Sequence, residues 1–241
     1  MEMQQVTSLI DDVLKGRKTR KDLDEVADHG FRSALQKISF LVLEKQIAYR
    51  SLNDLRINYD KIINALSCAI VLLQSDRNFP TKEDAARHAL EVVALEMPFH
   101  NMALFLCNED SLEMISSYNR EHQKISLPGK DTEPVTFAMG EGLTGWVAQH
   151  RETALLGDVT RDTRFTAKDA LGTPINSLIC TPLICRKELL GVLCFSHHIK
   201  GFFHEHDIRI FETLGEFMAY YLYHNVLIYN AQSSPGEDTG N

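Results

Sequence analysis

Residues 177–197, SLICTPLICRKELLGVLCFSH, decide the fold of this chain. Two runs of mostly apolar residues, 177–185 and 189–197, are joined by the polar turn Arg186-Lys187-Glu188. Each run has the length of a strand that is buried in a sheet, and a short polar connection is typical of a β-hairpin. This segment therefore predicts two adjacent antiparallel strands.

Further strands are expected before the hairpin. The run MALFLC at 102–107 is continuous and apolar, as in a central strand. The alternation of apolar and polar residues over 112–118 predicts a strand with one face in water. Short strands are expected over 135–137 and 153–159, with polar loops over 119–132 and 160–174.

Two amphipathic helices are expected at either side of these strands. Thr81 and Asp84 form a plausible capping box at the start of the first helix, which Pro98 ends. The second helix covers 205–229 and carries large apolar groups on two faces. A helix of this kind must bury both faces, and a second subunit is the simplest partner for the outer one.

A cluster of glycines precedes a short helix over 143–150. Gly140, Gly142 and Gly145 permit a tight backbone path into this helix, whose first N–H groups then face inward. Such donors suit an anionic or carbonyl group of a ligand, and a purely structural turn is the alternative. The spacing matches neither a dinucleotide fingerprint nor a phosphate-binding loop, because no Gly-Lys-Ser/Thr follows.

Residues 34–73 have the pattern of a long helix that packs along another helix. Apolar or aromatic residues recur at spacings of three and four, with Lys45 and Arg56 as the exceptions. We expect a dimeric coiled coil or helix bundle, and packing against the chain's own domain is the alternative. The predicted seam consists of Leu35, Ile38, Val42, Lys45, Tyr49, Leu52, Arg56, Tyr59, Ile63, Leu66, Ile70 and Leu73.

Three segments in order resemble the GAF domain family. They are GEGLTGWVAQHRETALLGDVTRDTRF (140–165), the hairpin of 177–197, and FFHEHDIRIFETLGEFMAYYL (202–222). The resemblance covers about 62–229. It implies an α+β fold with a mostly antiparallel sheet of five or six strands, helices on one face that pair with a second copy, and a small-molecule pocket on the other face. The expected organisation is a helical segment over 1–30, the long helix over 31–75, a GAF domain over 76–230 and a disordered tail over 231–241.

The resemblance also places the candidate ligand-binding residues. An aromatic wall with a few polar groups suits a small planar ligand, although Trp146 is equally compatible with the core and Asp158 with a surface pair to Arg161. The candidates are Phe105 on the central strand, Tyr118, Trp146 on the short helix, Asp158, Arg161 and Phe165 in the pocket loop, and Ser177 and Cys180 on the next strand.

Charge and cysteine content limit the function classes. The formal net charge of −8 argues against nucleic acid and anionic membranes as direct partners. The N-terminal residues do not resemble a signal peptide, and no apolar run has the length of a membrane span, so we expect a cytoplasmic protein. The five cysteines show no CxxC pair and are expected to be buried in a reducing compartment.

We therefore expect a non-enzymatic regulatory module of bacterial-type signal transduction. It would form a homodimer, bind an unidentified small molecule without a cofactor or a metal, and act on a separate signalling protein. Three alternatives stay open: a free methionine sulfoxide reductase that uses Cys180 or Cys185, a haem or iron gas sensor, and a scaffold with an empty pocket. The histidines considered as iron or zinc ligands are His197, His198, His204 and His206.

Other branches of the family are less well matched. The pocket loop 157–176 contains neither cysteine nor histidine, in contrast to bilin-binding members and to the reductases. The NKxxxFxxxDE signature of the cyclic-nucleotide-binding members is absent as well, which lowers the expectation of cyclic GMP as the ligand.

Overall fold

The computed structural model describes residues 3–18, 23, 29–75, 79–97, 99–121, 124–126, 135–170 and 174–233. The chain forms two compact units, Met1–Asp60 and Lys61–Asn241, and the boundary between them falls inside the longest helix. The tail predicted over 231–241 lies outside the described residues, apart from the three residues that end helix α5 (Ile208–Ser233).

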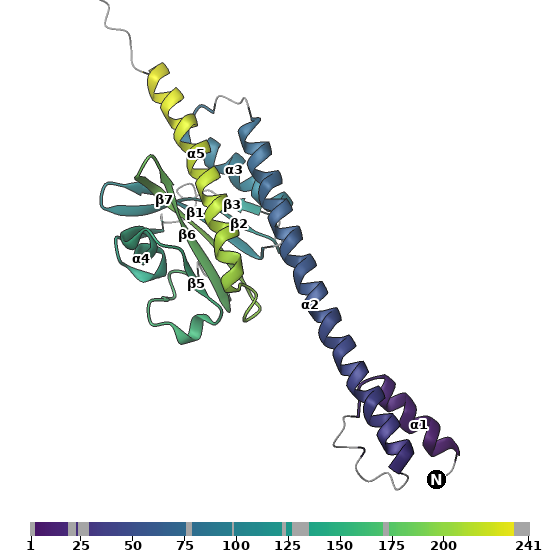
Figure 1. Ribbon diagram of the computed structural model, residues 1–241. Coiled ribbons are helices and arrows are strands. Elements are labelled where there is room, and N and C mark those ends of the chain that lie inside the picture. Colours follow the sequence, from purple (N-terminus) through teal and green to yellow (C-terminus); the bar gives the residue numbers. More distant parts are fainter. Residues whose placement is uncertain are drawn as a thin grey trace, which may run out of the picture. The chain divides into compact units, whose positions relative to one another are not determined.

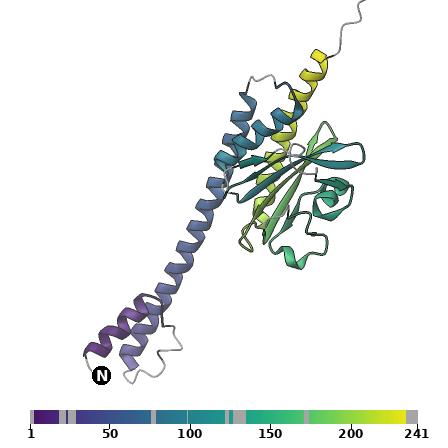
Figure 2. The ribbon, with the colours of Figure 1, turned by 180° about the vertical axis from the view of Figure 1, so that it is seen from behind.

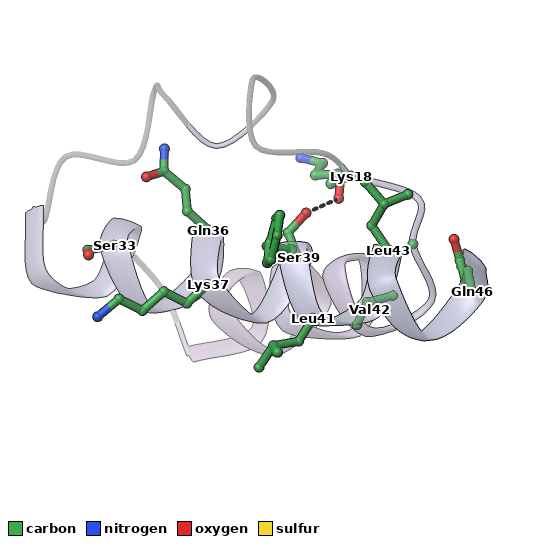
Figure 3. A pocket seen from close by; sticks show the side chains of 11 residues that line it. Lys18, Ser33, Gln36, Lys37, Ser39, Leu41, Val42, Leu43 and Gln46 are labelled. Atoms are coloured by element: carbon green, nitrogen blue, oxygen red, sulfur yellow. Dashed lines mark hydrogen bonds between the residues drawn. The ribbon is translucent and has the colours of Figure 1, made fainter. Parts of the chain in front are cut away.

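In the first unit, helix α1 (Met3–Leu14) lies beside the N-terminal part of helix α2 (His29–Leu73) (Figures 1 and 2). Their small core consists of Val13, Leu23 and Leu35. The same unit contains an open pocket of about 760 Å³, where Ser39 Oγ donates a 3.3 Å hydrogen bond to the Lys18 carbonyl oxygen (Figure 3). Apolar side chains of α2 also line this pocket, so the helix pair leaves apolar surface in contact with water.

Helix α2 confirms the predicted long helix and bears apolar side chains on two faces. In the second unit, Ala65, Cys68 and Leu72 are buried in the domain core. The neighbouring seam residues Ile63 and Leu66 are 44 % and 45 % exposed. The alternative packing against the chain's own domain therefore uses a stripe beside the predicted seam. The pairing of that seam with another helix stays a prediction.

The second unit contains an antiparallel sheet, which confirms the predicted fold class. Six strands follow the order β3-β2-β1-β7-β6-β5, and β4 adds a seventh strand by pairing with β2. The expectation of a loop over the whole of 119–132 was wrong, because residues 124–126 pair with the end of β2. The strands are β1 (Asn101–Asn108), β2 (Ser111–Asn119), β3 (Lys124–Ser126), β4 (Thr136–Ala138), β5 (Ala154–Leu156), β6 (Ser177–Cys185) and β7 (Glu188–His197).

Helices α3 (Lys82–Glu96) and α5 cover one face of the sheet, and the last turns of α2 contribute Ala65, Cys68 and Leu72 to the same core. Thr81 forms its half of the predicted capping box, since its Oγ1 accepts the Asp84 N–H at 3.1 Å, while the Asp84 carboxylate accepts the Thr81 hydroxyl at 2.9 Å. The inner face of α5 is buried, while Tyr220 on its outer face is 47 % exposed. None of the helices in the described residues is long and apolar enough to cross a membrane.

The opposite face of the sheet carries the short helix α4 (Gly142–His150) and the loop between β5 and β6 (Figures 1 and 2). This loop includes the 3₁₀ turn η2 (Val159–Arg161). The second core lies here and includes Phe105, Phe137 and Leu143. The sheet therefore separates a helix-side core from a loop-side core, and a pocket on the loop side was expected from the resemblance.

Candidate functional site

A cavity of about 240 Å³ lies on the loop side of the sheet. Small or short polar side chains on three adjacent strands leave this space open. The walls include Leu178, Ser126, Ala170 and the acidic residue Asp169. The floor consists of cross-strand neighbours on β1, β2 and β7: Asn101, Ala103, Ser117, Asn119, Cys194 and Ser196.

The floor of this cavity is polar but uncharged. Asn119 Nδ2 donates a 2.7 Å hydrogen bond to Asn101 Oδ1, which fixes the two amides next to each other. Ser196 is 7 % exposed, and within the described residues its hydroxyl and that of Ser117 have no hydrogen-bond partner. Neither oxygen is among the buried unpartnered atoms of the described residues, so both hydroxyls are accessible from the cavity. The floor therefore offers donor and acceptor groups to a small polar molecule.

Asp169 connects the loop to the start of α4. One carboxylate oxygen accepts the Thr144 N–H at 3.0 Å and the Thr144 hydroxyl at 2.9 Å. The other accepts the Leu143 N–H at 3.3 Å and both the N–H and the hydroxyl of Thr166 at 2.8 Å. Asp169 is 7 % exposed, so a negative charge sits in a largely dry place with five donors around it.

The glycines explain why this carboxylate fits. Gly142 has φ +64°, and a Cβ atom there would lie 2.8 Å from an Asp169 oxygen. Free N–H groups and the helix dipole make such a helix start attractive to an anion. The sequence predicted inward-facing donors at this helix start that suit a ligand group. The structure fills those donors with a side chain of the chain itself.

Of the eight predicted site residues, only Tyr118 borders the cavity, and its ring packs on the helix-side core. The reason is a β-bulge in β2. Leu104 pairs with Ser116 and Phe105 with Met114, so Ile115 is an extra residue that reverses which face the later side chains occupy. Simple alternation from Leu112 onward would have placed Tyr118 on the loop side.

The other aromatic candidates lie in or next to the loop-side core. Phe105 is 1 % exposed and packs edge-to-face on Phe137. Trp146 is half-buried on α4, where it stacks on His150 at 4.3 Å and lies under the Arg164 guanidinium. Phe165 packs against the same core. None of these three rings is among the described residues that line the cavity.

Asp158 and Arg161 lie at the loop surface. Asp158 caps the turn η2, and its carboxylate accepts the Thr160 hydroxyl at 2.7 Å and Lys200 Nζ at 2.9 Å. The Thr160 hydroxyl, then Lys200, lowers the pKa of Asp158 to about 2. Asp158 therefore stabilises the loop by pairing with Lys200, whereas a pair with Arg161 was the sequence-based alternative.

Ser177 and Cys180 point to different environments on β6. The Ser177 hydroxyl donates to the Ile199 carbonyl oxygen at 2.8 Å and holds the end of the sheet. Cys180 is fully buried in the loop-side core opposite Cys194. Burial, followed by the interaction with Cys194, raises the pKa of the Cys180 thiol well above its usual value. Cys185 packs on the helix-side core, so the two cysteines lie on opposite faces of the sheet.

The histidines form two groups near the end of β7. His100 Nδ1 lies 3.3 Å from His198 Nδ1, and the His197 ring stacks on Phe202 at 3.7 Å. Burial, then the neighbouring imidazoles, lowers the pKa of His197 to about 4.

The second group consists of His204, His206 and Asp207, whose potential ligand atoms lie within 4.8 Å of one another. Asp207 Oδ1, however, is 2.7 Å from Lys61 Nζ, in an ion pair whose side chains are 0 % and 8 % exposed. A metal ion at this group would compete with the buried ammonium of Lys61 for the same carboxylate.

The residues that sequence reasoning missed are those of the cavity floor and Asp169. A usable signal exists for the floor, because alternating small or short polar residues occur at 101 and 103, at 117 and 119, and at 194 and 196. In a buried sheet such positions leave space where larger side chains would fill it. Asp169 has no comparable signal, since its contacts with α4 are separated by 25 and 26 residues in sequence.

Comparisons with known proteins agree with this architecture. Among curated proteins, the cone cGMP-specific 3′,5′-cyclic phosphodiesterase subunit α′ of Bos taurus is 25 % identical over 162 residues, 63 % of this chain and 19 % of that subunit. A probable 3′,5′-cyclic phosphodiesterase of Caenorhabditis elegans is 24 % identical over 112 residues, 46 % of this chain and 15 % of that protein. The chain thus spans less than a fifth of the length of these relatives.

Solved structures show the same fold. The GAF domain of a phosphoenolpyruvate-protein phosphotransferase from Coxiella burnetii superposes with a TM-score of 0.55 at 22 % identity, over 69 % of this chain and 97 % of that one. Free methionine-R-sulfoxide reductase from Neisseria meningitidis, in complex with its substrate, gives 0.52 at 16 % identity, over 67 % and 87 %.

Residues 80–222, more than half of the chain, match the family described as "GAF domain". This range contains the sheet, α3, α4, the loop with Asp169 and most of α5. The chain therefore belongs to the GAF domain family.

Proposed function

We propose that this chain is a non-enzymatic regulatory module that senses a small molecule in the 240 Å³ cavity, dimerises through its helices and acts on a separate signalling protein. The observation that carries the proposal is a polar-floored cavity on one face of the sheet, with helices that retain exposed apolar surface in the same unit. A regulatory sensor role is the general role of this fold family, which supports the proposal.

Contacts connect the cavity to the last turns of α2. The floor residues Asn101 and Ser196 are direct chain neighbours of His100 and His197. The His197 ring stacks on Phe202, and Lys61 Nζ lies 5.6 Å from the centre of the Phe202 ring. Ligand binding that shifts the ends of β1 and β7 would therefore bias the packing around Lys61.

The exposed seam of α2 supports a second copy as the partner. Exposed apolar residues recur along the helix, including Leu52 at 62 %, Leu55 at 65 % and Leu66 at 45 %. Apolar stripes of this length are unusual on a helix that stays in water. Since the seam follows a heptad, a parallel or antiparallel copy of the same helix is the simplest cover for it.

A reductase activity is the second candidate. The fold similarity to the Neisseria meningitidis enzyme motivates it, but it shows the fold alone. A nucleophilic cysteine requires a thiolate, and burial of Cys180 raises its pKa and so lowers the thiolate fraction. The described part of the pocket loop offers no cysteine in its place. These observations favour the regulatory role.

Native mass spectrometry of the purified protein tests the proposal. We expect a dimer mass with an additional small-molecule mass, and monomers for the Leu52→Glu/Leu66→Glu variant because charged side chains in the seam oppose helix pairing. Leu95→Glu is the matched control, since Leu95 is 84 % exposed on α3 and outside the seam. A wild-type protein that stays monomeric at tens of micromolar, or a variant that stays dimeric, would contradict the dimer.

A further inference from the structure

Two histidines from distant parts of the chain meet where β1 begins and β7 ends. His100 directly precedes β1, His198 directly follows β7, and 98 residues separate them in sequence. Their Nδ1 atoms lie 3.3 Å apart. With Zn–N bonds of about 2.0–2.1 Å, two nitrogen ligands of a tetrahedral zinc ion lie about 3.3–3.4 Å apart. The pair therefore has the spacing of two ligands that share one metal ion.

Main-chain hydrogen bonds hold both histidines in place. The His100 N–H donates to the Ser196 carbonyl oxygen at 3.3 Å, and the His100 carbonyl oxygen accepts the Arg120 N–H at 2.9 Å. The His198 carbonyl oxygen accepts a hydrogen bond from Asn176 Nδ2 at 2.7 Å. A metal site needs ligands whose positions are fixed before the ion arrives. The backbone around this pair provides such support on both sides.

We propose that His100 and His198 bind a divalent transition-metal ion of the zinc type through their Nδ1 atoms, with water molecules in the remaining coordination positions. Imidazole nitrogens are preferred ligands of zinc, copper and nickel. His198 is exposed, so an ion reaches the pair from solvent. The ion would link the start of β1 to the residue after β7, beside the cavity-floor residues Asn101 and Ser196. This site goes beyond the proposed sensing function and differs from the sequence-based expectation that no metal is bound.

The groups around the pair suit a metal ligand. The second ring nitrogen of His100, Nε2, lies 3.8 Å from Glu121 Oε1. The Glu121 side chain is 67 % exposed, so a small rotation brings its carboxylate within hydrogen-bond distance. A metal-bound histidine usually donates its second N–H to a carboxylate or a carbonyl oxygen, which fixes the ring and increases its basicity. Glu121 is placed for this role.

His197 lies next to the pair but is not a third ligand. Its Nδ1 accepts the Ile199 N–H at 3.1 Å, and its ring stacks on Phe202. In a neutral imidazole with Nδ1 as the acceptor, Nε2 carries the proton. Neither nitrogen of His197 is therefore left for a metal ion.

The second histidine group is the weaker candidate for a metal ion. His204, His206 and Asp207 offer three ligand atoms within 4.8 Å of one another, but Asp207 Oδ1 already lies 2.7 Å from Lys61 Nζ. A divalent cation there would lie close to a buried ammonium, and the two positive charges would repel each other. The His100 and His198 pair has an anion nearby instead, at Glu121.

A hydrogen bond between the two imidazoles is the metal-free alternative. One Nδ1 would then carry a proton and donate it to the other at 3.3 Å, a distance beyond the usual range for N–H donors. Metal binding instead requires that both Nδ1 atoms are unprotonated. The two arrangements therefore predict opposite results in a metal titration.

Metal titration of the purified full chain tests the assignment. The protein is treated with EDTA, dialysed at about pH 7.5, where imidazoles are mostly neutral, and titrated with Zn²⁺ by calorimetry. A parallel titration with Co²⁺ is followed by visible absorption, which is intense when Co²⁺ is tetrahedral. We expect one ion per chain with a Kd below about 100 µM. Either His100→Ala or His198→Ala should weaken binding at least about tenfold, because each removes one of the two protein ligands.

The variant His204→Ala/His206→Ala is the matched control and should keep the wild-type affinity within about twofold. His198 is exposed, so His198→Ala should fold even if His100→Ala does not, and its melting temperature checks this.

Three results would overturn the assignment. The first is a wild type that binds neither ion at concentrations of about 1 mM. The second is a folded His198→Ala variant with wild-type affinity. The third is loss of binding in the control variant with retention in His198→Ala, which would place the ion at the second histidine group. The titration requires neither a small-molecule ligand nor a dimer, so its outcome is independent of the test of the proposed function.

Discussion

Replacing Lys61 by methionine should destabilise the second unit more than any exposed charge substitution. Lys61 Nζ lies 2.7 Å from Asp207 Oδ1, and both side chains are almost completely buried. Methionine preserves most of the aliphatic volume but leaves the Asp207 carboxylate without its cation. Removal of one partner of a buried ion pair costs about 3–5 kcal/mol, because the remaining charge is buried and uncompensated.

For Lys61→Met, we expect a loss of stability at the lower end of the range of about 3–5 kcal/mol. Asp207 Oδ2 still accepts the His204 N–H at 2.8 Å after the substitution, so the carboxylate keeps one strong hydrogen bond. We therefore expect a loss of about 3 kcal/mol. With a urea m-value of about 2 kcal/mol per molar for a domain of this size, the unfolding midpoint would fall by about 1.5 M.

Urea denaturation followed by circular dichroism at fixed protein concentration measures this shift. Arg56→Met is the matched control, because the Arg56–Asp60 pair is 3.9 Å apart with side chains 81 % and 62 % exposed. Such a pair contributes less than about 0.5 kcal/mol. A Lys61→Met midpoint within 0.5 M of the wild type, as a rough threshold for about 1 kcal/mol, would refute the reasoning.

Two further substitutions test the packing of the sheet and the histidine at the end of β7. Gly191→Ala should prevent folding of the sheet, because the added Cβ would collide with the Phe105 carbonyl oxygen on β1. Gly201→Ala is the control, because the space around it is open and the variant should lose only the stability that its positive φ costs. Thermal melts compare the two variants. His197→Asn should flatten the pH dependence of stability. His197 has a lowered pKa of about 4, so the unfolded state binds its proton first, and wild-type stability should fall as the pH drops from about 6.5 to 4; an unchanged slope in the variant would contradict this.

The sequence was sufficient for the elements but not for the details of their register. The hairpin of 177–197 forms as predicted, with Cys185 opposite Glu188. A regular continuation would place Cys180 opposite Leu193. The irregularity between Leu183 and Ile184 shifts the pairing by one residue and brings Cys194 opposite Cys180 instead. A bulge of this kind depends on packing between strands and helices, which local sequence patterns do not record.

The candidate site was also hard to predict, because a cavity depends on how side chains from distant segments pack together. The prominent aromatic residues that the family layout assigns to the pocket lie elsewhere in this chain: Phe105 fills the loop-side core, and Trp146 stacks on His150 at the surface of α4. The space occurs instead where side chains are small, beside Ala103 and Cys194. Cavities are defined by what the neighbouring side chains do not fill, so a search for prominent residues overlooks them.

Lys61 also bears on how the last turns of α2, from Lys61 onward, pack within the second unit. An apolar stripe of small residues, such as Ala65 and Ala69, allows a helix to pack closely but permits several rotations about its axis. A single buried ammonium that reaches only the Asp207 carboxylate is satisfied in one of them. We infer that the ion pair selects the rotation that leaves Ile63 and Leu66 exposed for a partner helix, in the way that buried polar groups specify register in coiled coils. Lys61→Met/Asp207→Asn should then recover part of the stability that Lys61→Met loses, while native mass spectrometry reports a mixture of oligomers; a double variant with the wild-type oligomeric state would show that apolar packing alone orients the helix.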